Sequence, residues 1–131
     1  QFEAIEDALG ELVGAEETAR LRAQRQLEIL PVGRLQGRTF SDAFILIDEA
    51  QNMTVRRMRM ALGRLGERSR MVVTGDPVHV ELKEDEPSGF AHLLDMVDGE
   101  DFAAVHRFQT RQIMRNPVVA RLEALYAAHP G

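Results

Sequence analysis

The 131-residue chain contains no cysteine and no tryptophan, and only one tyrosine. Without cysteine, neither a disulfide framework nor a thiolate metal site can form. No apolar run approaches the roughly 20 residues that a membrane-spanning helix requires. The N-terminal residues include Glu3, Glu6 and Asp7, a composition that does not fit a signal peptide. We therefore expect a cytoplasmic protein without membrane contacts.

The chain also lacks an excess of positive charge. Its 16 basic residues are outnumbered by 21 acidic ones, which gives a formal net charge of −5. This balance argues against a dedicated duplex-binding protein, although a local basic surface is still compatible with it. With 44% hydrophobic residues and no internal repeat, residues 1–131 are expected to form one domain with its own core.

The most informative stretch is FILIDEAQN, residues 44–52. Four apolar residues run without a polar break into two adjacent carboxylates, Asp48 and Glu49. An unbroken apolar run of this length is typical of a strand buried on both faces of a parallel sheet. Ligands collect at the carboxyl ends of such strands. The two carboxylates are therefore placed where a ligand would bind.

A second stretch repeats this design. Met71–Val73 is an apolar strand, and Thr74, Gly75 and Asp76 follow it directly. A helix-length segment separates the two strands, which predicts a strand–helix–strand unit with parallel strands. Both polar strand ends then meet at the same edge of the sheet. Two such strands at this spacing indicate a nucleoside triphosphatase core.

The chemistry of such a core suggests a role for each polar residue. Asp48 is expected to hold Mg²⁺ through its water shell, because Mg²⁺ favours carboxylate oxygens and keeps several waters. Glu49 is expected to polarise the attacking water. Thr74 and Asp76 are expected to sense the γ-phosphate from the neighbouring strand.

Four segments carry a resemblance to a known family, namely FILIDEAQNMT, RLGERSRMVVTGDP, SGF and RQIMRNPVVARL. They are similar to the PhoH-like family of P-loop ATPases, which are relatives of the superfamily 1 helicases. The resemblance covers nearly the whole chain. It implies an α/β fold of the RecA-like type, with ATP and Mg²⁺ bound and Asp48–Glu49 as the Walker B pair. Gln51 and Asp76 would be relay residues, and Thr74 and Gly75 would contact the nucleotide. RNA and further copies of the chain are the implied partners.

Two positions depart from the family pattern. His79 stands where the family has Gln, and Glu81 stands where it has Asp. A neutral His can donate and accept hydrogen bonds as Gln does, with less reach, so His79 is either a nucleotide contact or an ordinary surface residue. By the resemblance, Arg115 is a candidate γ-phosphate arginine, although Asn116 follows it where the family has His. The alternative is a surface arginine near a helix start.

One segment superficially resembles a phosphate-binding loop. Gly33–Thr39 is one residue short between its glycines, and Arg38 occupies the lysine position of GxxxxGK[ST]. One missing residue would spoil the wrapping of backbone N–H groups around phosphates. We therefore expect no phosphate loop here, although Arg38 is retained as a nucleotide contact that offsets phosphate charge. The chain is expected to be the C-terminal part of a P-loop domain whose phosphate loop lies upstream.

The remaining patterns complete a mostly parallel sheet of about four strands flanked by helices. Helices are predicted at residues 2–13, 15–24, 54–66, 88–99 and 116–126, and further strands at 27–30 and 103–108. Apolar residues are expected to face the core in the third and last helices, namely Val55, Met58, Leu62 and Leu65, and then Val118, Val119, Leu122, Leu125 and Tyr126.

The outer face of the predicted 54–66 helix carries Arg56, Arg57, Arg59 and Arg64. One interpretation is a solvated face, and the other is a contact surface for nucleic acid backbone or an anionic partner. Without interleaved aromatic residues it offers no stacking platform for single strands. Two hypotheses for the whole chain stay open, an ATPase or a non-catalytic interaction module on a nucleotidase scaffold.

Overall fold

The computed structural model describes residues 3–83, 85–109, 112 and 114–130. It divides into two compact units, residues 1–96 and residues 97–131. The predicted helix position of Phe2 lies outside the described residues. Within the described part of the chain, no helix is long and apolar enough to cross a membrane.

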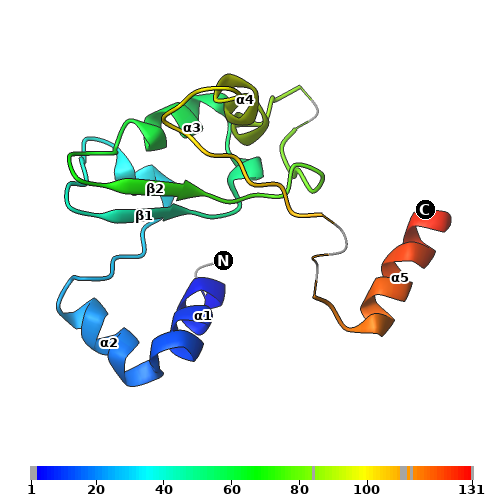
Figure 1. The fold of residues 1–131 in the computed structure, drawn as a ribbon, viewed down its shortest axis with the longest axis horizontal. Helices are drawn as coiled ribbons and strands as arrows, with labels where there is room; N and C mark the ends of the chain where they lie inside the picture. Colours follow the sequence, from blue (N-terminus) through cyan, green and yellow to red (C-terminus); the bar gives the residue numbers. More distant parts are fainter. Residues whose placement is uncertain (1–2, 84, 110–111, 113, 131) are drawn as a thin grey trace. The chain divides into compact units, whose positions relative to one another are not determined.

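The first unit contains a two-stranded parallel sheet, formed by β1 (Phe44–Ile47) and β2 (Arg70–Val73) (Figure 1). In the register, Phe44 pairs with Arg70 and Ile47 pairs with Val73. The two strands and their parallel orientation are as the sequence predicts. β-Branched and aromatic residues favour the extended conformation here, and both runs end where polar residues begin.

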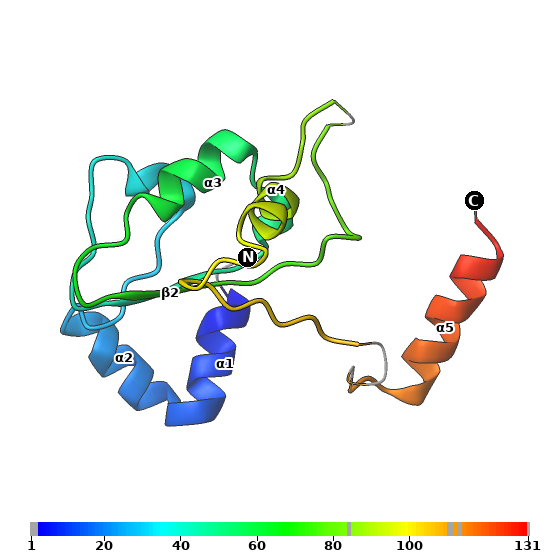
Figure 2. The ribbon, with the colours of Figure 1, turned by 45° about the horizontal axis from the view of Figure 1, so that its top comes forward.

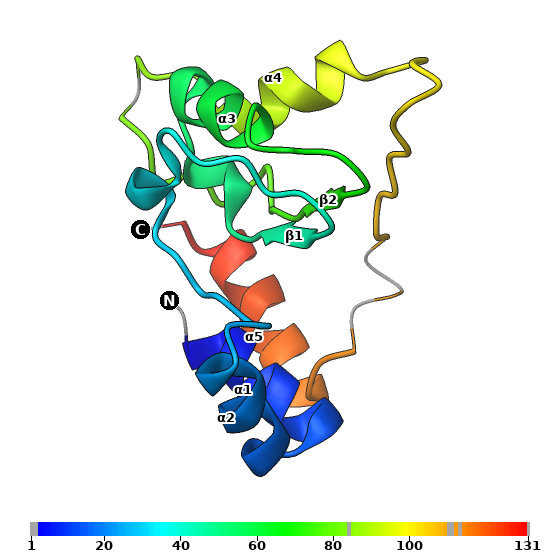
Figure 3. The ribbon, with the colours of Figure 1, turned by 90° about the vertical axis from the view of Figure 1, so that its left-hand side faces the viewer.

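Two helices cover one face of this sheet, α3 (Val55–Leu62) and α4 (Gly89–Met96) (Figures 1 and 3). The core is centred on residues of β1, α3, α4 and the short 3₁₀ helix η2 (Ala50–Asn52). Its buried apolar members are Ile47, Ala50, Met53, Met58, Ala61 and Phe90, with Ile45, Met71 and Val73 packed against them. The core therefore lies directly beneath the segment that follows β1.

The opposite face of the sheet is exposed, which corrects the prediction of a strand buried on both faces. Phe44 is 71% exposed, and Leu46 and its partner Val72 are also exposed. Because side chains alternate along a strand, residues 44 and 46 share one face while residues 45 and 47 share the other. Only the second of these faces has helices packed on it.

Thr54 begins α3, as predicted, because its hydroxyl accepts a hydrogen bond from the backbone N–H of Arg57. The helix ends at Leu62, four residues earlier than the sequence suggested, and Leu65 is exposed. Gly66 serves a different purpose from a helix stop. Its N–H donates to the carbonyl of Phe40 at 2.8 Å, and a Cβ there would lie 2.6 Å from that oxygen.

The prediction of two further strands, at residues 27–30 and 103–108, is wrong. Neither segment is in a strand in the structure, so the four-stranded sheet becomes a two-stranded one. A strand needs a neighbour for its N–H and C=O groups, and an apolar run alone does not supply one. The 3₁₀ helix η1 (Val32–Leu35) lies just after the first of these two segments.

The other helices are α1 (Glu3–Val13), α2 (Ala15–Ala23) and α5 (Pro117–Ala128) (Figure 2). Asn116 caps α5 through a 2.9 Å bond from the N–H of Val118, and Pro117 follows at the first helical position, as predicted. The predicted buried face of α5 is wrong, because it is exposed in the second unit. The residues concerned are Val118, Val119, Leu122, Leu125 and Tyr126.

Candidate functional site at the ends of β1 and β2

Asp48 and Thr74 lie next to each other, directly after the paired ends of β1 and β2. The N–H of Thr74 donates to the carbonyl of Ile47 at 2.8 Å, and the N–H of Ala50 donates back to the carbonyl of Thr74 at 3.0 Å. The Thr74 hydroxyl donates to Oδ1 of Asp48 at 2.8 Å. The structure therefore brings together two residues that are 26 positions apart and that the sequence placed at one sheet edge.

Glu49 follows in a backbone conformation that is uncommon for a residue with a side chain. Its φ of 55° and ψ of 37° are left-handed, which costs a non-glycine residue about 1–2 kcal/mol. Such strained residues cluster at functional sites, where the surrounding structure holds them in place. The strained residue here turns the chain from β1 into η2.

Gln51 is buried, with 3% of its surface exposed, and its amide joins both strand ends. Its Nε2 donates to Oε2 of Glu49 at 2.7 Å. Its Oε1 accepts from the backbone N–H of Asp76 at 3.0 Å. Asp48 and Glu49 themselves are exposed. The segment thus presents two solvent-facing carboxylates on a buried and hydrogen-bonded support.

Asp76 begins the loop after β2 and organises its first turn. Its carboxylate accepts a bond from Nδ1 of His79 at 2.7 Å and another from the N–H of Val78 at 2.9 Å. The hydrogen bond from His79, with that from Val78, holds the pKa of the Asp76 carboxyl below its ordinary value. The predicted His79 therefore does lie beside the predicted Asp76.

Two further residues anchor this loop and were not predicted as site residues. Oδ1 of Asn52 accepts from the N–H of Glu81 at 2.8 Å, and the hydroxyl of Ser88 donates to the carbonyl of Gln51 at 2.9 Å. Asn52 directly follows the DEAQ letters, and that position is the only signal the sequence offers for it. The loop from Asp76 to Ser88 is thus tied to η2 at its start, its middle and its end.

Gly75 has a packing reason to lack a side chain. A Cβ at this position would lie 2.9 Å from Oε1 of Gln51 and 2.9 Å from Cδ1 of Phe90. Phe90 is 7% exposed, so its ring has little room to move. This account of Gly75 is independent of any nucleotide contact.

Arg38 and Arg115, both predicted site residues, each have a partner within their own unit. Arg38 has Nη1 3.1 Å from Oε2 of Glu28, and its guanidinium carbon lies 4.6 Å from the centre of the Phe40 ring. Arg115 belongs to the second unit, where its Nη1 lies 3.7 Å from Oε1 of Glu123. Within the first unit, no hydrogen bond or ion pair among the described residues joins Arg38 to the carboxylates after β1.

The donor set fits Mg²⁺ held mainly through water rather than a dedicated protein cage. Among the described residues, no three His, Asp or Glu side chains gather closely enough to hold a metal ion. Asp48 offers one exposed carboxylate beside the Thr74 hydroxyl. Mg²⁺ is commonly bound through one or two carboxylates, waters and substrate phosphates, which is compatible with this pair.

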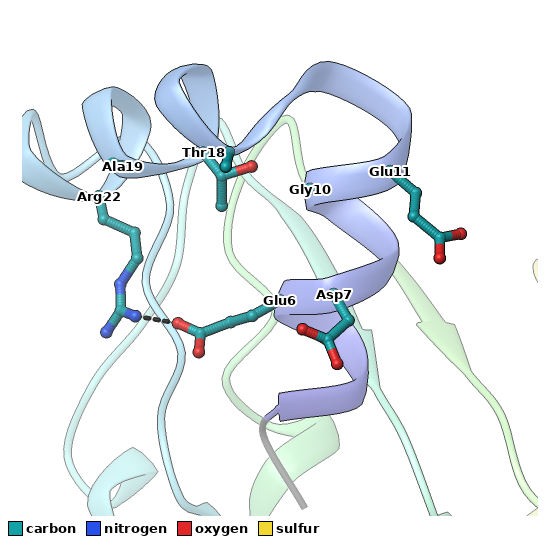
Figure 4. Close-up of a pocket in the computed structure, with 8 residues that line it drawn as sticks. Glu6, Asp7, Gly10, Glu11, Thr18, Ala19 and Arg22 are labelled. Atoms are coloured by element: carbon teal, nitrogen blue, oxygen red, sulfur yellow. Dashed lines mark hydrogen bonds and ion pairs between the residues drawn. The ribbon is translucent and has the colours of Figure 1, made fainter.

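A separate hollow of about 550 Å³ lies between α1 and α2 (Figure 4). Glu6 from α1 forms an ion pair with Arg22 from α2, and the Thr18 hydroxyl donates to the carbonyl of Gly14 at 3.0 Å. None of the predicted site residues lines this hollow.

Residues 1–127 match the family described as PhoH-like protein. The chain is 38% identical over 120 residues to a PhoH-like protein of Bacillus subtilis (strain 168), an alignment covering 92% of this chain and 38% of that protein. It is 33% identical over 123 residues to a PhoH-like protein of Mycobacterium tuberculosis (strain ATCC 25618 / H37Rv), covering 94% and 35%. It is 32% identical over 102 residues to Protein PhoH of Escherichia coli (strain K12), covering 78% and 29%.

The chain therefore spans between 29% and 38% of the length of these three relatives. The matched region contains both strand ends and the loop between β2 and α4. With the family match extending over residues 1–127, the chain belongs to the PhoH-like protein family.

Proposed function

We propose that this chain is the C-terminal part of a RecA-like ATPase domain and that the ends of β1 and β2 form half of its hydrolytic site. The observation that carries the proposal is the bond between the Thr74 hydroxyl and Asp48, at 2.8 Å. The bond joins a carboxylate, which is a group that can bind Mg²⁺, to a hydroxyl, which is a group that can contact a γ-phosphate. Ligands of parallel α/β sheets bind at that edge.

Each residue then has a defined task. Asp48 holds Mg²⁺ through its carboxylate, and the ion, when bound, offsets the charge of the phosphates. Glu49 accepts the proton of the attacking water. Thr74, Asp76 and His79 face the γ-phosphate from β2 and the loop that follows it. Arg115, supplied by this subunit or by a neighbour in a homo-oligomer, stabilises the transferred charge.

The phosphate cradle is assigned to a segment outside these 131 residues. A phosphate loop needs consecutive backbone N–H groups at a helix N-terminus, together with a lysine. Residues 33–35 belong to the 3₁₀ helix η1, and Arg38 is engaged by Glu28 and Phe40. We use the name parent form for a longer form of the protein that includes this cradle. Its proposed ATPase activity is located in the cytoplasm.

RNA is the proposed macromolecular partner, and the outer face of α3 is its contact surface. Arg56, Arg57 and Arg59 are exposed, and none has an ion-pair partner among the described residues. Arg56 and Arg57 lie in the first turn, where the helix dipole disfavours cations. Exposed arginines on one helix face suit a surface that binds phosphates.

The test measures phosphate release from ATP by the parent form, with Glu49 present and with Glu49 replaced. Glu49→Gln removes the proton acceptor but keeps size and hydrogen-bonding capacity. We expect turnover to be lost while ATP affinity stays largely intact. The matched control is Glu100→Gln, the same chemical change at an exposed residue of the second unit. Hydrolysis that survives Glu49→Gln would show that another group is the base.

One observation favours a second function, that of a non-catalytic interaction module. The uncovered sheet face exposes Phe44, Leu46 and Val72, which is an apolar surface suited to a protein contact. A parent form that binds no ATP and releases no phosphate would support this alternative.

A further inference from the structure

The side chain of Gln51, for which the family resemblance implies a part in a relay, is closed off from solvent. It is 3% exposed, and both ends of its amide are occupied. The donor end reaches Oε2 of Glu49, and the acceptor end holds the N–H of Asp76. A residue in this position acts through its neighbours.

The two ends of the amide differ in what they accomplish. The acceptor end satisfies a backbone N–H, which is a common structural duty of a buried side chain. The donor end is directed to Glu49, whose exposed carboxylate water could solvate equally well. The bond between Gln51 and Glu49 therefore satisfies the amide donor of the buried Gln51, and it also holds the Glu49 carboxylate in one orientation.

Orientation matters at Glu49 because its backbone turns abruptly. Glu49 is left-handed at this turn, and a glutamate side chain has several rotatable bonds. The bond from Nε2 of Gln51, at 2.7 Å, restricts that freedom. Gln51 is in turn fixed by close packing against Gly75, where even a Cβ would lie 2.9 Å from its Oε1.

We propose that Gln51 is a positioning residue. It orients the Glu49 carboxylate toward the attacking water and couples that orientation to the position of the loop beginning at Asp76. The inference rests on the proposed ATPase function and deepens it. One amide spans the end of β1 and the start of the loop after β2. A shift of the loop at Asp76 is therefore passed to the carboxylate of Glu49.

Two substitutions distinguish the contribution of the donor end of the amide from that of its acceptor end. Gln51→Glu keeps the size and the acceptor for the Asp76 N–H, but it replaces the permanent N–H donor by a second carboxyl group, which either repels Glu49 or shares a proton with it. Gln51→Met keeps the packing volume and removes both ends. Gln36→Glu is the control, because Gln36 is exposed and the change in charge is the same.

In this chain, hydrogen exchange at the Asp76 amide reports on the acceptor end. We expect exchange in Gln51→Glu to match the wild type and exchange in Gln51→Met to be at least about tenfold faster. The amides of α3 serve as an internal reference for intact folding. Rapid exchange at Asp76 in the wild type would contradict the described bond.

In the parent form, ATP turnover reports on the donor end. We expect Gln51→Glu to lower kcat by roughly ten- to a hundredfold with KM for ATP nearly unchanged, because only the geometry of the transition state is affected. Gln51→Met should also lower kcat with KM nearly unchanged. It tests the positioning role if the Gln51→Glu protein does not fold. A wild-type kcat in both folded variants would overturn the positioning role and leave the ATPase proposal intact. Absence of turnover in the wild-type parent form would overturn the ATPase proposal and this inference together.

Discussion

Gly75→Ala should destabilise the first unit by about 1–2 kcal/mol, although it adds only one methyl group to an exposed position. The new Cβ would lie 2.9 Å from Oε1 of Gln51, 2.9 Å from Cδ1 of Phe90 and 3.0 Å from Cε1 of the same ring. Comfortable carbon contacts are about 3.5–4.0 Å, so both side chains would have to move by several tenths of an ångström.

The magnitude follows from two opposing effects. Overpacking a well-packed site costs about 1–3 kcal/mol, and Phe90 is part of the buried core. Replacing glycine by alanine at a compatible backbone position returns about 0.4–1 kcal/mol by restricting the unfolded chain. Gly75 does not have a positive φ, so backbone strain adds nothing to the cost.

Urea unfolding followed by far-UV circular dichroism measures this difference in the free energy of unfolding. Gly33→Ala is the matched control, because a Cβ there meets no atom within 4 Å and φ is not positive. It should change the free energy of unfolding by less than about 0.5 kcal/mol. A Gly75→Ala protein as stable as the wild type would refute the close packing of Gln51 and Phe90 around this glycine.

Two further predictions concern charge. His79→Ala should raise the pKa of the Asp76 carboxyl toward its ordinary value, as read from a carbon-detected NMR titration, because the bond from His79 lowers it. Since the folded pKa is lowered, the stabilisation from this bond is present above the ordinary carboxyl pKa of 3.8 and is lost as the pH falls through the lowered value; an unmoved pKa in the variant would contradict the described bond. Arg56→Gln with Arg59→Gln should weaken binding of a single-stranded RNA homopolymer and reduce the slope of log K against log salt by up to about 1.4, at roughly 0.7 per lost phosphate contact. Unchanged affinity and slope would mean that this face of α3 is only solvated.

The strand ends were predictable because their signal is local. Each apolar run stops at polar residues, and a helix-length segment between the runs predicts parallel strands whose ends meet. The structure agrees, since Asp48 and Thr74 are hydrogen-bonded. The N-caps of α3 and α5 were predictable for the same reason, because Thr54 and Asn116 bond within their own first turns.

What depends on distant partners was not predictable. The apolar segments at 27–30 and 103–108 have strand-like composition, yet a strand forms only where another strand pairs with it. The hydrogen bond from Asp76 to Gln51 and the close packing at Gly75 involve residues 15 to 25 positions away, and no pattern in the sequence indicates them. The left-handed turn at Glu49 is likewise set by its surroundings, because glutamate has no preference for it.

The division of the nucleotide site between these residues and an external phosphate cradle is tested most directly by calorimetric titration with Mg-ATP. The 131-residue chain has the anionic residues Asp48, Glu49 and Asp76 after its two strands, and in the same unit Arg38 is paired with Glu28. We expect no binding tighter than about 1 mM for this chain and low-micromolar binding, roughly −8 kcal/mol, for the parent form. Low-micromolar binding by the 131-residue chain itself would contradict the division and would return Gly33–Thr39 to consideration as a phosphate loop.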